Sequence, residues 1–231
     1  MALLMFIISS VFYVATAQAE RLNINFNHDW KFNLGDQYNA HLPDFDDSNW
    51  RTLTVPHDWS FENGISKEGS QSANGGYFDS GLGWYRKSFQ VPKDWQNKRI
   101  NIEFDGVYMN SEVWINGQYL GKTAYGYISF RHDLSKHLKP GGNVIALRVD
   151  NIKDPSARWY HPSGIYAPVK LEVTQPPHIQ PNGVYVTTPK VTSSSAEVTI
   201  RTDLINSGDL NQDLYLQSSV FDAKGNLLSE T

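Results

Sequence analysis

The chain has 231 residues, enough for one large β domain or about one and a half average ones, and a formal net charge of −4. It has no basic cluster, which argues against a nucleic-acid partner. It has no cysteine, which excludes disulfides, thiolate zinc sites, a cysteine nucleophile and a lipid-modified cysteine. Aromatic residues make up 13 %, which suits an all-β fold and also a surface that stacks on sugar rings or bases.

The first 19 residues carry no charged side chain. An apolar stretch from Leu3 to Val14 precedes Ala17-Gln18-Ala19, the small-x-small pattern of a signal-peptidase site. We therefore expect a signal peptide at 1–19, a mature chain that begins at Glu20, and export to the periplasm or the cell exterior. A basic segment before the apolar stretch is missing. The alternative is an uncleaved anchor, for which the apolar stretch is short.

From Arg21 to Asp47 short apolar pieces alternate with turn formers. Residues 27–32 indicate a turn into a strand, and 45–50 a turn or a single helical turn. Residues 51–59 predict a short strand stopped by Pro56, which has no N–H for a ladder. Residues 63–83 predict a long polar loop with six glycines. Loops of this length inside a compact domain are usually functional or disordered.

The next strand is predicted at 83–92, with Tyr85 and Phe89 on one face and Trp84 and Arg86 on the other. Alternation at 100–104 predicts a half-buried strand. A turn at 105–106 and a strand centred on 113–115 follow. Asn116-Gly117 between two apolar runs predicts a hairpin, because a type I′ turn needs positive φ at both central residues. One hairpin cannot bury its own apolar face, so further strands must cover it.

Further strands are predicted at 127–134, 143–149 and 169–173, and the second of these is apolar on both faces, as a central strand would be. Pro176-Pro177 marks a boundary. Three strand candidates follow, at 184–186, 196–202 and 214–221, with the spacing of a small β-sandwich. Three strands are too few to close one. We therefore expect an all-β chain with a first domain at 20–177 and an incomplete second domain at 178–231.

Few residues carry a recognisable catalytic pattern. His57-Asp58 resembles a base with its orienting acid, but adjacent strand residues point to opposite faces, so the pair is assigned to structure. The histidines have no HxH or HExxH spacing, and we expect no metal site. The GxSxG, GxxxxGK[ST] and GxGxxG patterns are absent.

The densest group of polar and aromatic residues follows the strand end at Asp150-Asn151. Arg158, Trp159, Tyr160 and His161 come within the next ten residues. Sugar recognition uses this mixture, because planar bidentate groups bind vicinal hydroxyls and aromatic faces cover the C–H side of the ring. The alternative is a purely structural loop, in which Trp159 plugs the core and Arg158 pairs with Asp150. The residue types leave both interpretations open.

Five motifs follow one another along the chain: Val55-Pro-His-Asp-Trp59, Gly83-Trp-Tyr-Arg-Lys-Ser-Phe89, Phe104-Asp-Gly-Val107, Val113-Trp-Ile-Asn-Gly117 with Leu120-Gly121, and Arg158-Trp-Tyr-His-Pro-Ser-Gly-Ile-Tyr166. In this order, over roughly residues 21–175, they resemble glycoside hydrolase family 2. The resemblance is greatest to β-galactosidases of the kind common in gut Bacteroidetes. β-Glucuronidases and β-mannosidases share this domain type, so the motifs are much less specific for the sugar.

The resemblance implies a jelly-roll β-sandwich of the galactose-binding type at 20–177, a partial immunoglobulin-like β-sandwich at 178–231, and then a (β/α)₈ barrel that carries the chemistry. Retaining hydrolysis needs two carboxyl groups, and in this family the acid/base is the Glu of an Asn-Glu pair. This sequence has no Asn-Glu dipeptide. The catalytic Glu pair is therefore expected beyond Thr231, or was lost, and this segment alone is expected to be inactive. No cofactor is implied.

The resemblance also implies that the first domain reaches over the barrel mouth. Asn151 would hydrogen-bond a sugar hydroxyl, with Asp150 as the competing choice, and Arg158 would position it. Trp159 or Tyr160 would wall the site, and the glycine-rich loop would contribute Asp79. The implied partners are a β-galactoside substrate and the chain's own barrel. A non-catalytic carbohydrate-binding module and a domain that only mediates oligomer contacts are the alternatives; assembly into a homo-oligomer stays open.

Overall fold

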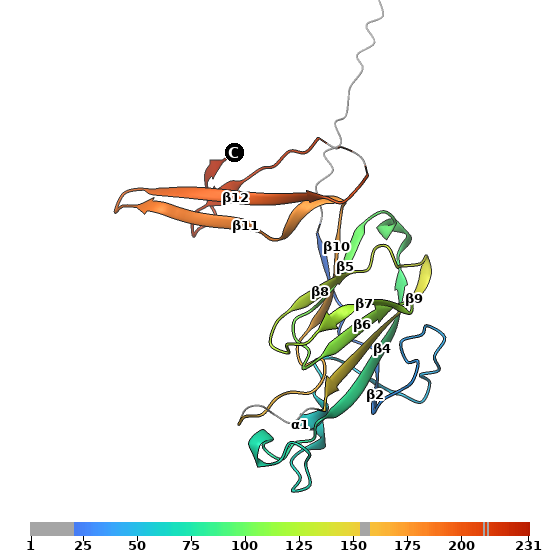
Figure 1. The fold of residues 1–231 in the computed structure, drawn as a ribbon. Coiled ribbons are helices and arrows are strands. Elements are labelled where there is room, and N and C mark those ends of the chain that lie inside the picture. Colours follow the sequence, from blue (N-terminus) through green and yellow to red (C-terminus); the bar gives the residue numbers. More distant parts are fainter. Residues whose placement is uncertain (1–20, 153–157, 210, 212) are drawn as a thin grey trace, which may run out of the picture.

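The computed structural model describes residues 21–152, 158–209, 211 and 213–231. The predicted signal peptide at 1–19 lies outside the described residues. The strands of the described chain pair antiparallel, and no helix in it is long and apolar enough to span a membrane. Two sheets form the main body (Figure 1). This arrangement confirms the predicted all-β sandwich.

The larger sheet has six strands in the order β3-β2-β4-β9-β6-β7, and the smaller has four in the order β1-β10-β5-β8. The strands of the larger sheet are β2 (Trp30–Leu34), β3 (Arg51–Leu53), β4 (Gly81–Val91), β6 (Ser111–Ile115), β7 (Gln118–Thr123) and β9 (Gly141–Asn151). Those of the smaller are β1 (Leu22–Asn25), β5 (Arg99–Phe104), β8 (Phe130–Asp133) and β10 (Val169–Thr174).

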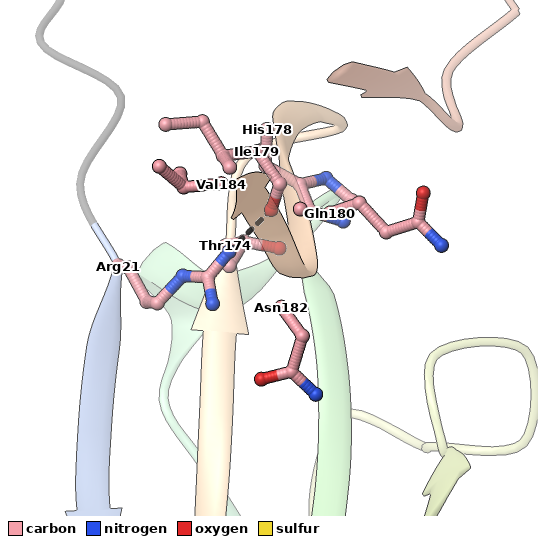
Figure 2. Close-up of a pocket in the computed structure, with 8 residues that line it drawn as sticks. Arg21, Thr174, His178, Ile179, Gln180, Asn182 and Val184 are labelled. Atoms are coloured by element: carbon pink, nitrogen blue, oxygen red, sulfur yellow. Dashed lines mark hydrogen bonds between the residues drawn. The ribbon is translucent and has the colours of Figure 1, made fainter. Parts of the chain in front are cut away.

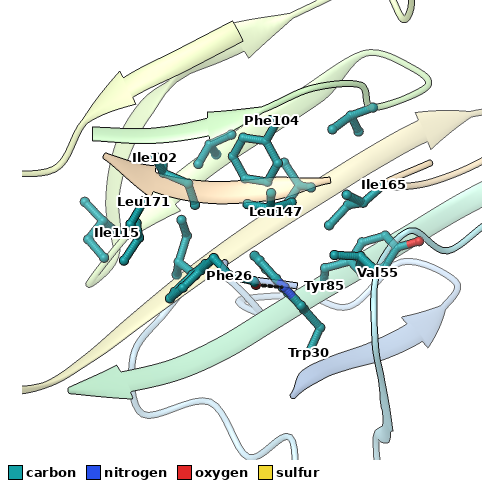
Figure 3. Close-up of a cluster of buried hydrophobic side chains, with 14 of the residues drawn as sticks. Phe26, Trp30, Val55, Tyr85, Ile102, Phe104, Ile115, Leu147, Ile165 and Leu171 are labelled. Carbon is teal, nitrogen blue, oxygen red and sulfur yellow. Dashed lines mark hydrogen bonds between the residues drawn. The ribbon is translucent and has the colours of Figure 1, made fainter. Parts of the chain in front are cut away.

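The core lies between the two sheets (Figure 3). Ile102 and Phe104 come from the smaller sheet, Tyr85 and Leu147 from the larger, and none of the four is exposed to solvent. Each alternates with residues on the opposite face of its strand, as the period of two in the sequence predicts. Burial of each such side chain stabilises the fold by roughly 1.5–3 kcal/mol.

The centre of the larger sheet is the pair β4 and β9, which run antiparallel over eleven residues each. β9 lies between β4 and β6, which confirms the central strand predicted at 143–149. The outer face of β4 is also buried, because residues 36–50 cover Trp84 and Arg86. The alternation of residues along β4 predicts correctly which side chains share a face. It does not predict that residues 36–50 cover the outer face.

The Asn116-Gly117 turn joins β6 to β7 as predicted. Asn116 has φ of 50° and Gly117 has φ of 82°, so both central residues are in the left-handed region that a type I′ turn requires. Residues 105–110 carry the chain from the smaller sheet to the larger, since β5 and β6 belong to different sheets.

The strand predicted to stop at Pro56 is present as β3, which ends at Leu53. A short helix that was not predicted, α1 (Trp59–Asn63), follows. Asp58 accepts the backbone N–H groups of Ser60 and Phe61 and so caps this helix. The loop from 64 to 80 contains a single 3₁₀ turn, η1 (Ala73–Gly75), and a second one, η2 (Lys93–Trp95), follows β4.

Beyond Pro176 the described chain forms two hairpins. The first joins β11 (Pro177–Val191) to β12 (Ala196–Asn206) and extends away from the sandwich (Figure 1). The second joins β13 (Ser219–Phe221) to β14 (Leu227–Glu230). The third predicted strand is therefore shorter than expected, and β14 was not predicted. The immunoglobulin-like character of this part stays a prediction.

Candidate functional site

The candidate site lies at one end of the β4–β9 pair, where Gly81 opposes Asn151. Because the two strands are antiparallel, the segment that precedes β4 meets the segment that follows β9. The first segment contains α1 and the glycine-rich loop, and the second contains residues 158–166. The topology thus brings together two parts of the chain that are about eighty residues apart.

Asp58 joins the two segments. Its Oδ1 caps α1 and also accepts the backbone N–H of Ser163 at 2.9 Å, and its Oδ2 accepts the Tyr160 hydroxyl. Burial and this carboxylate together raise the pKa of Tyr160 far above its usual range, so the phenol stays protonated and keeps donating. The Tyr160 ring also packs against Phe78, with ring centroids 4.5 Å apart.

A chain of buried polar groups runs beneath this junction. Asn151 Nδ2 donates to Ser163 Oγ at 2.7 Å, and the hydroxyls of Ser163 and Ser60 are hydrogen-bonded at 2.6 Å. The Ser60 hydroxyl also contacts the backbone carbonyl of Asp79. Asn151 is only 4 % exposed, so these bonds fix the orientation of its amide. Two of the predicted site residues, Asn151 and Asp79, are therefore linked through the two serines.

Asp150 is held by a different set of contacts. Its Oδ2 lies 3.4 Å from Arg148, and its Oδ1 accepts the N–H of Ile152 at 3.2 Å. The segment before β6 binds its backbone, through the Met109 carbonyl at 3.0 Å and the Asn110 side chain at 3.1 Å. The strand end at 150–151 is therefore anchored to the β6–β7 side of the sheet.

The alternative in which Arg158 pairs with Asp150 and Trp159 plugs the core is wrong. Asp150 pairs with Arg148, and the Trp159 side chain is 60 % exposed. Arg158 is exposed as well. The Asp79 carboxylate is 3.4 Å from the N–H of Ser70 in its own loop, so the part of Asp79 that reaches the serine pair is its backbone carbonyl.

Next to Asp58 lies an open pocket of about 580 Å³. Tyr160 is the predicted site residue that lines it. His57, which was assigned to structure, donates or accepts a hydrogen bond with the Tyr85 hydroxyl at 2.7 Å through Nδ1. The sequence did not predict Phe61, Glu62 or Tyr166 as lining residues. Of these, Tyr166 belongs to one of the recognised motifs, as do His57 and Asp58. The full lining is Pro56, His57, Asp58, Phe61, Glu62, Tyr160, Pro162 and Tyr166.

One wall of this pocket is a charged cluster. Glu62 is hydrogen-bonded to Arg51 and to His57 Nε2, the latter at 3.1 Å. The Arg51 hydrogen bond is the main reason that the pKa of Glu62 falls to about 2, so Glu62 is ionised at neutral pH. Arg51 is thereby already neutralised. The cluster consequently presents no free cation to a ligand.

A separate pocket of about 370 Å³ lies at the C-terminal end of β10, where the chain enters β11 (Figure 2). Arg21 crosses it, donating to Glu172 at 2.9 Å and to the Ile179 carbonyl. None of the six predicted site residues lines it. Within the ranges that the structure describes, no three His, Asp or Glu side chains are grouped closely enough to hold a metal ion.

Stability should fall on mild acidification. Burial lowers the pKa of His57, His132 and His161 below the ordinary value of 6.5, so each prefers to be neutral in the folded state. Below about pH 6.5 the unfolded chain then binds more protons than the folded chain, so the free energy of unfolding decreases as the pH falls from about 6.5 toward the lower folded-state pKa values. Urea unfolding at about pH 7.5 and pH 5.5 measures this. Equal stability at both pH values would contradict it, and His132→Gln should make the dependence shallower.

Comparison with known proteins places these features in context. A family model described as "Glycosyl hydrolases family 2, sugar binding domain" matches residues 24–171. A "Putative beta-glucuronidase" from Formosa agariphila is 51 % identical over 203 residues, which are 88 % of this chain and 19 % of the relative. "Beta-galactosidase BoGH2A" from Bacteroides ovatus is 48 % identical over 208 residues, 90 % of this chain and 24 % of the relative.

Among solved structures, a β-glycosidase from Bacteroides vulgatus superimposes with a TM-score of 0.83 at 39 % identity. The match covers 90 % of this chain and 27 % of that structure. The chain thus spans about a fifth to a quarter of the length of the named relatives.

Proposed function

The chain belongs to glycoside hydrolase family 2, and from this premise we propose that it forms the substrate-shaping N-terminal part of an exported retaining β-galactosidase. The observation that carries the proposal is the junction at the β4–β9 end. There Asn151, the serine pair and Asp58 lock two distant segments into one rigid rim beside an open pocket. Such a rim is suited to hold a sugar in a fixed orientation.

The residues of this chain would bind and orient, and the two reacting carboxyl groups would come from a barrel. Retaining hydrolysis proceeds through a covalent glycosyl-enzyme intermediate and needs a nucleophile and an acid/base about 5–5.5 Å apart. The hydrogen bond to Ser163 uses one N–H of the Asn151 amide. The remaining N–H and Oδ1 are the groups with which Asn151 would meet a sugar hydroxyl. Tyr160 and Trp159 would form the wall beside it.

The charges around the rim favour a neutral sugar. Asp58 lines the pocket, whereas the nearby carboxylates of Glu62 and Asp150 are paired with Arg51 and Arg148. The negative charge of Asp58 would repel the carboxylate of a glucuronide at short range, which supports a β-galactoside as the substrate. β-Glucuronidase is the second candidate, because one relative at 51 % identity bears that name and Arg158 is an exposed cation in the same segment.

The test is a substrate panel on a protein that joins this chain to its barrel. We expect the nitrophenyl β-galactoside to be hydrolysed at least tenfold more efficiently than the β-glucuronide, and the reverse order would favour the second candidate. The 231-residue chain by itself should turn over neither substrate. Measurable hydrolysis by it would contradict the assignment of both reacting carboxyl groups to the barrel.

Replacement of Asn151 by alanine should lower kcat/KM in that enzyme. Loss of one polar contact to the sugar is worth on the order of 1–3 kcal/mol, or roughly 5- to 150-fold. Ser163→Ala is the matched control, because it removes the hydrogen bond that orients the amide and leaves the amide in place; its effect should be smaller. An unchanged kcat/KM in Asn151→Ala would remove this residue from the site.

A further inference from the structure

Five aromatic side chains gather beside the candidate site. We call this set, Tyr108, Tyr125, Tyr127, Trp159 and His161, the aromatic platform. Its outer members are open to solvent: the side chains of Tyr125 and Trp159 are each 60 % exposed, and that of Tyr127 is 43 % exposed. The first three come from the segments that flank the β6–β7 hairpin, and the other two from the segment that follows β9.

The platform is packed as a unit. His161 stacks on Tyr108 with ring centroids 4.9 Å apart and an interplanar angle of 11°, and its Nδ1 is hydrogen-bonded to the Tyr127 hydroxyl at 2.8 Å. Tyr127 also contacts Tyr108 at 5.1 Å, and Trp159 contacts His161 at 5.6 Å between centroids. The exposed rings therefore rest on the buried His161 and the half-buried Tyr108, which limit their motion and so lower the entropy lost when a ligand binds.

The base of the platform contains an unused polar atom. His161 is 7 % exposed, and its Nε2 is buried without a hydrogen-bond partner among the described residues. Buried nitrogen atoms are rarely left unpaired, because the lost hydrogen bond to water is not replaced. The atom lies on a ring that touches three platform members, so the base of the platform holds a polar group next to the exposed rings.

The platform is continuous with the candidate pocket. Tyr166 lines the pocket and donates its hydroxyl to the Gly126 carbonyl at 2.8 Å, between Tyr125 and Tyr127. The ring centroids of Tyr127 and Tyr166 are 6.4 Å apart. Trp159 directly precedes Tyr160, which lines the same pocket. A ligand with one end in the pocket could extend along these rings.

We propose that the aromatic platform binds the sugar units of an oligosaccharide that follow the unit held in the pocket, so that the preferred substrate is a neutral galacto-oligosaccharide. The inference rests on the proposed function and extends it to a substrate class. Exposed Tyr and Trp faces cover the C–H side of a pyranose ring, while the tyrosine hydroxyls can meet its equatorial hydroxyls.

The experiment is a calorimetric titration of the 231-residue chain with β-linked galactotetraose and, separately, with galactose. The tetrasaccharide should bind at least about tenfold more tightly than the monosaccharide. Tyr125→Ala and Trp159→Ala should each weaken tetrasaccharide binding by roughly fivefold to tenfold. Tyr38→Ala is the matched control, since Tyr38 is 90 % exposed and belongs to the segment that covers the outer face of β4, and it should leave the affinity unchanged.

Three outcomes would overturn the proposal: no binding of the tetrasaccharide, equal affinity for the tetrasaccharide and galactose, or binding that both variants leave unchanged. Far-UV circular dichroism of each variant checks that it is folded, and Tyr125 and Trp159 are exposed enough for truncation to be tolerated. Binding is measured here without hydrolysis. Absence of tetrasaccharide binding would therefore contradict the platform proposal without contradicting the β-galactosidase proposal. A preference for the β-glucuronide in the nitrophenyl substrate panel would contradict the β-galactosidase proposal and leave the measured affinities unchanged.

Discussion

Arg86→Met should lower the free energy of unfolding by about 3–5 kcal/mol, because it leaves the acceptors around a buried guanidinium without their donor. Arg86 is 1 % exposed and lies on the outer face of β4. Its Nε donates to Asp47 Oδ2 at 2.8 Å, and its Nη1 donates to the carbonyls of Ala40 and Leu42, the latter at 2.9 Å. Methionine fills a similar space but donates to none of these acceptors. Segment 36–50 would then lose the bonds that hold it to the sheet.

Chemical denaturation measures this change, and Arg148→Met is the matched control. Arg148 opposes Trp84 across the β4–β9 pair and lies on the same face of the sheet as Arg86. It is partly exposed, and its ion pairs with Glu112 and Asp150 are 3.2 and 3.4 Å long. Partly exposed pairs of this kind contribute up to about 1 kcal/mol. If the two variants lost equal stability, Arg86 would not be the anchor of segment 36–50.

Gly164→Ala should destabilise the chain by about 2–6 kcal/mol, the sum of backbone strain and overpacking. Gly164 has φ of +114°, a conformation that side chains other than glycine rarely adopt. A Cβ at this position would lie 2.1 Å from the Tyr85 hydroxyl and 2.9 Å from the His57 carbonyl. Tyr85 is fully buried and cannot withdraw. The added methyl group would break the Tyr85–His57 hydrogen bond and displace the segment that carries Tyr160 and Ser163.

Gly35→Ala separates the two causes. Gly35 has a similar φ of +104°, but a Cβ there would meet no atom within 4 Å. It should therefore show the strain alone, about 1–3 kcal/mol. Thermal unfolding of both variants gives the comparison. Equal losses in the two variants would mean that the contact with Tyr85 relaxes without cost.

The elements that could be predicted were those whose conformation is determined by residues adjacent in the chain. The alternation at 100–104 and the doubly apolar run at 143–149 reflect the two faces of a strand, which the chain itself encodes with a period of two. The Asn116-Gly117 turn is equally local, because only a few residue types adopt positive φ at both positions. By contrast, α1 was not predicted, because its five residues are too few to show a helical period.

The candidate site could be predicted only in part. The motif order pointed to the segment after β9, and Asn151 and Tyr160 do lie at the junction. The strand-geometry argument for His57-Asp58 did not apply, because Asp58 caps a helix and is not in a strand. No sequence pattern predicted the hydrogen bond between the two serines or the burial of Arg86 beneath segment 36–50. Ser60 and Ser163 are 103 residues apart, one in α1 and the other in the segment after β9, and nothing local relates them.

By itself, therefore, the sequence determined the strands, the hairpin turn and the family, because alternation, turn chemistry and ordered motifs are properties of the chain. Only the tertiary structure decided which strands share a sheet, and so which loops meet. Long-range contacts depend on that pairing: Asp58 reaches Tyr160 across 102 positions, and the platform joins rings from three separate segments. These contacts turn a group of polar and aromatic residues into a fixed surface, and no local rule specifies them.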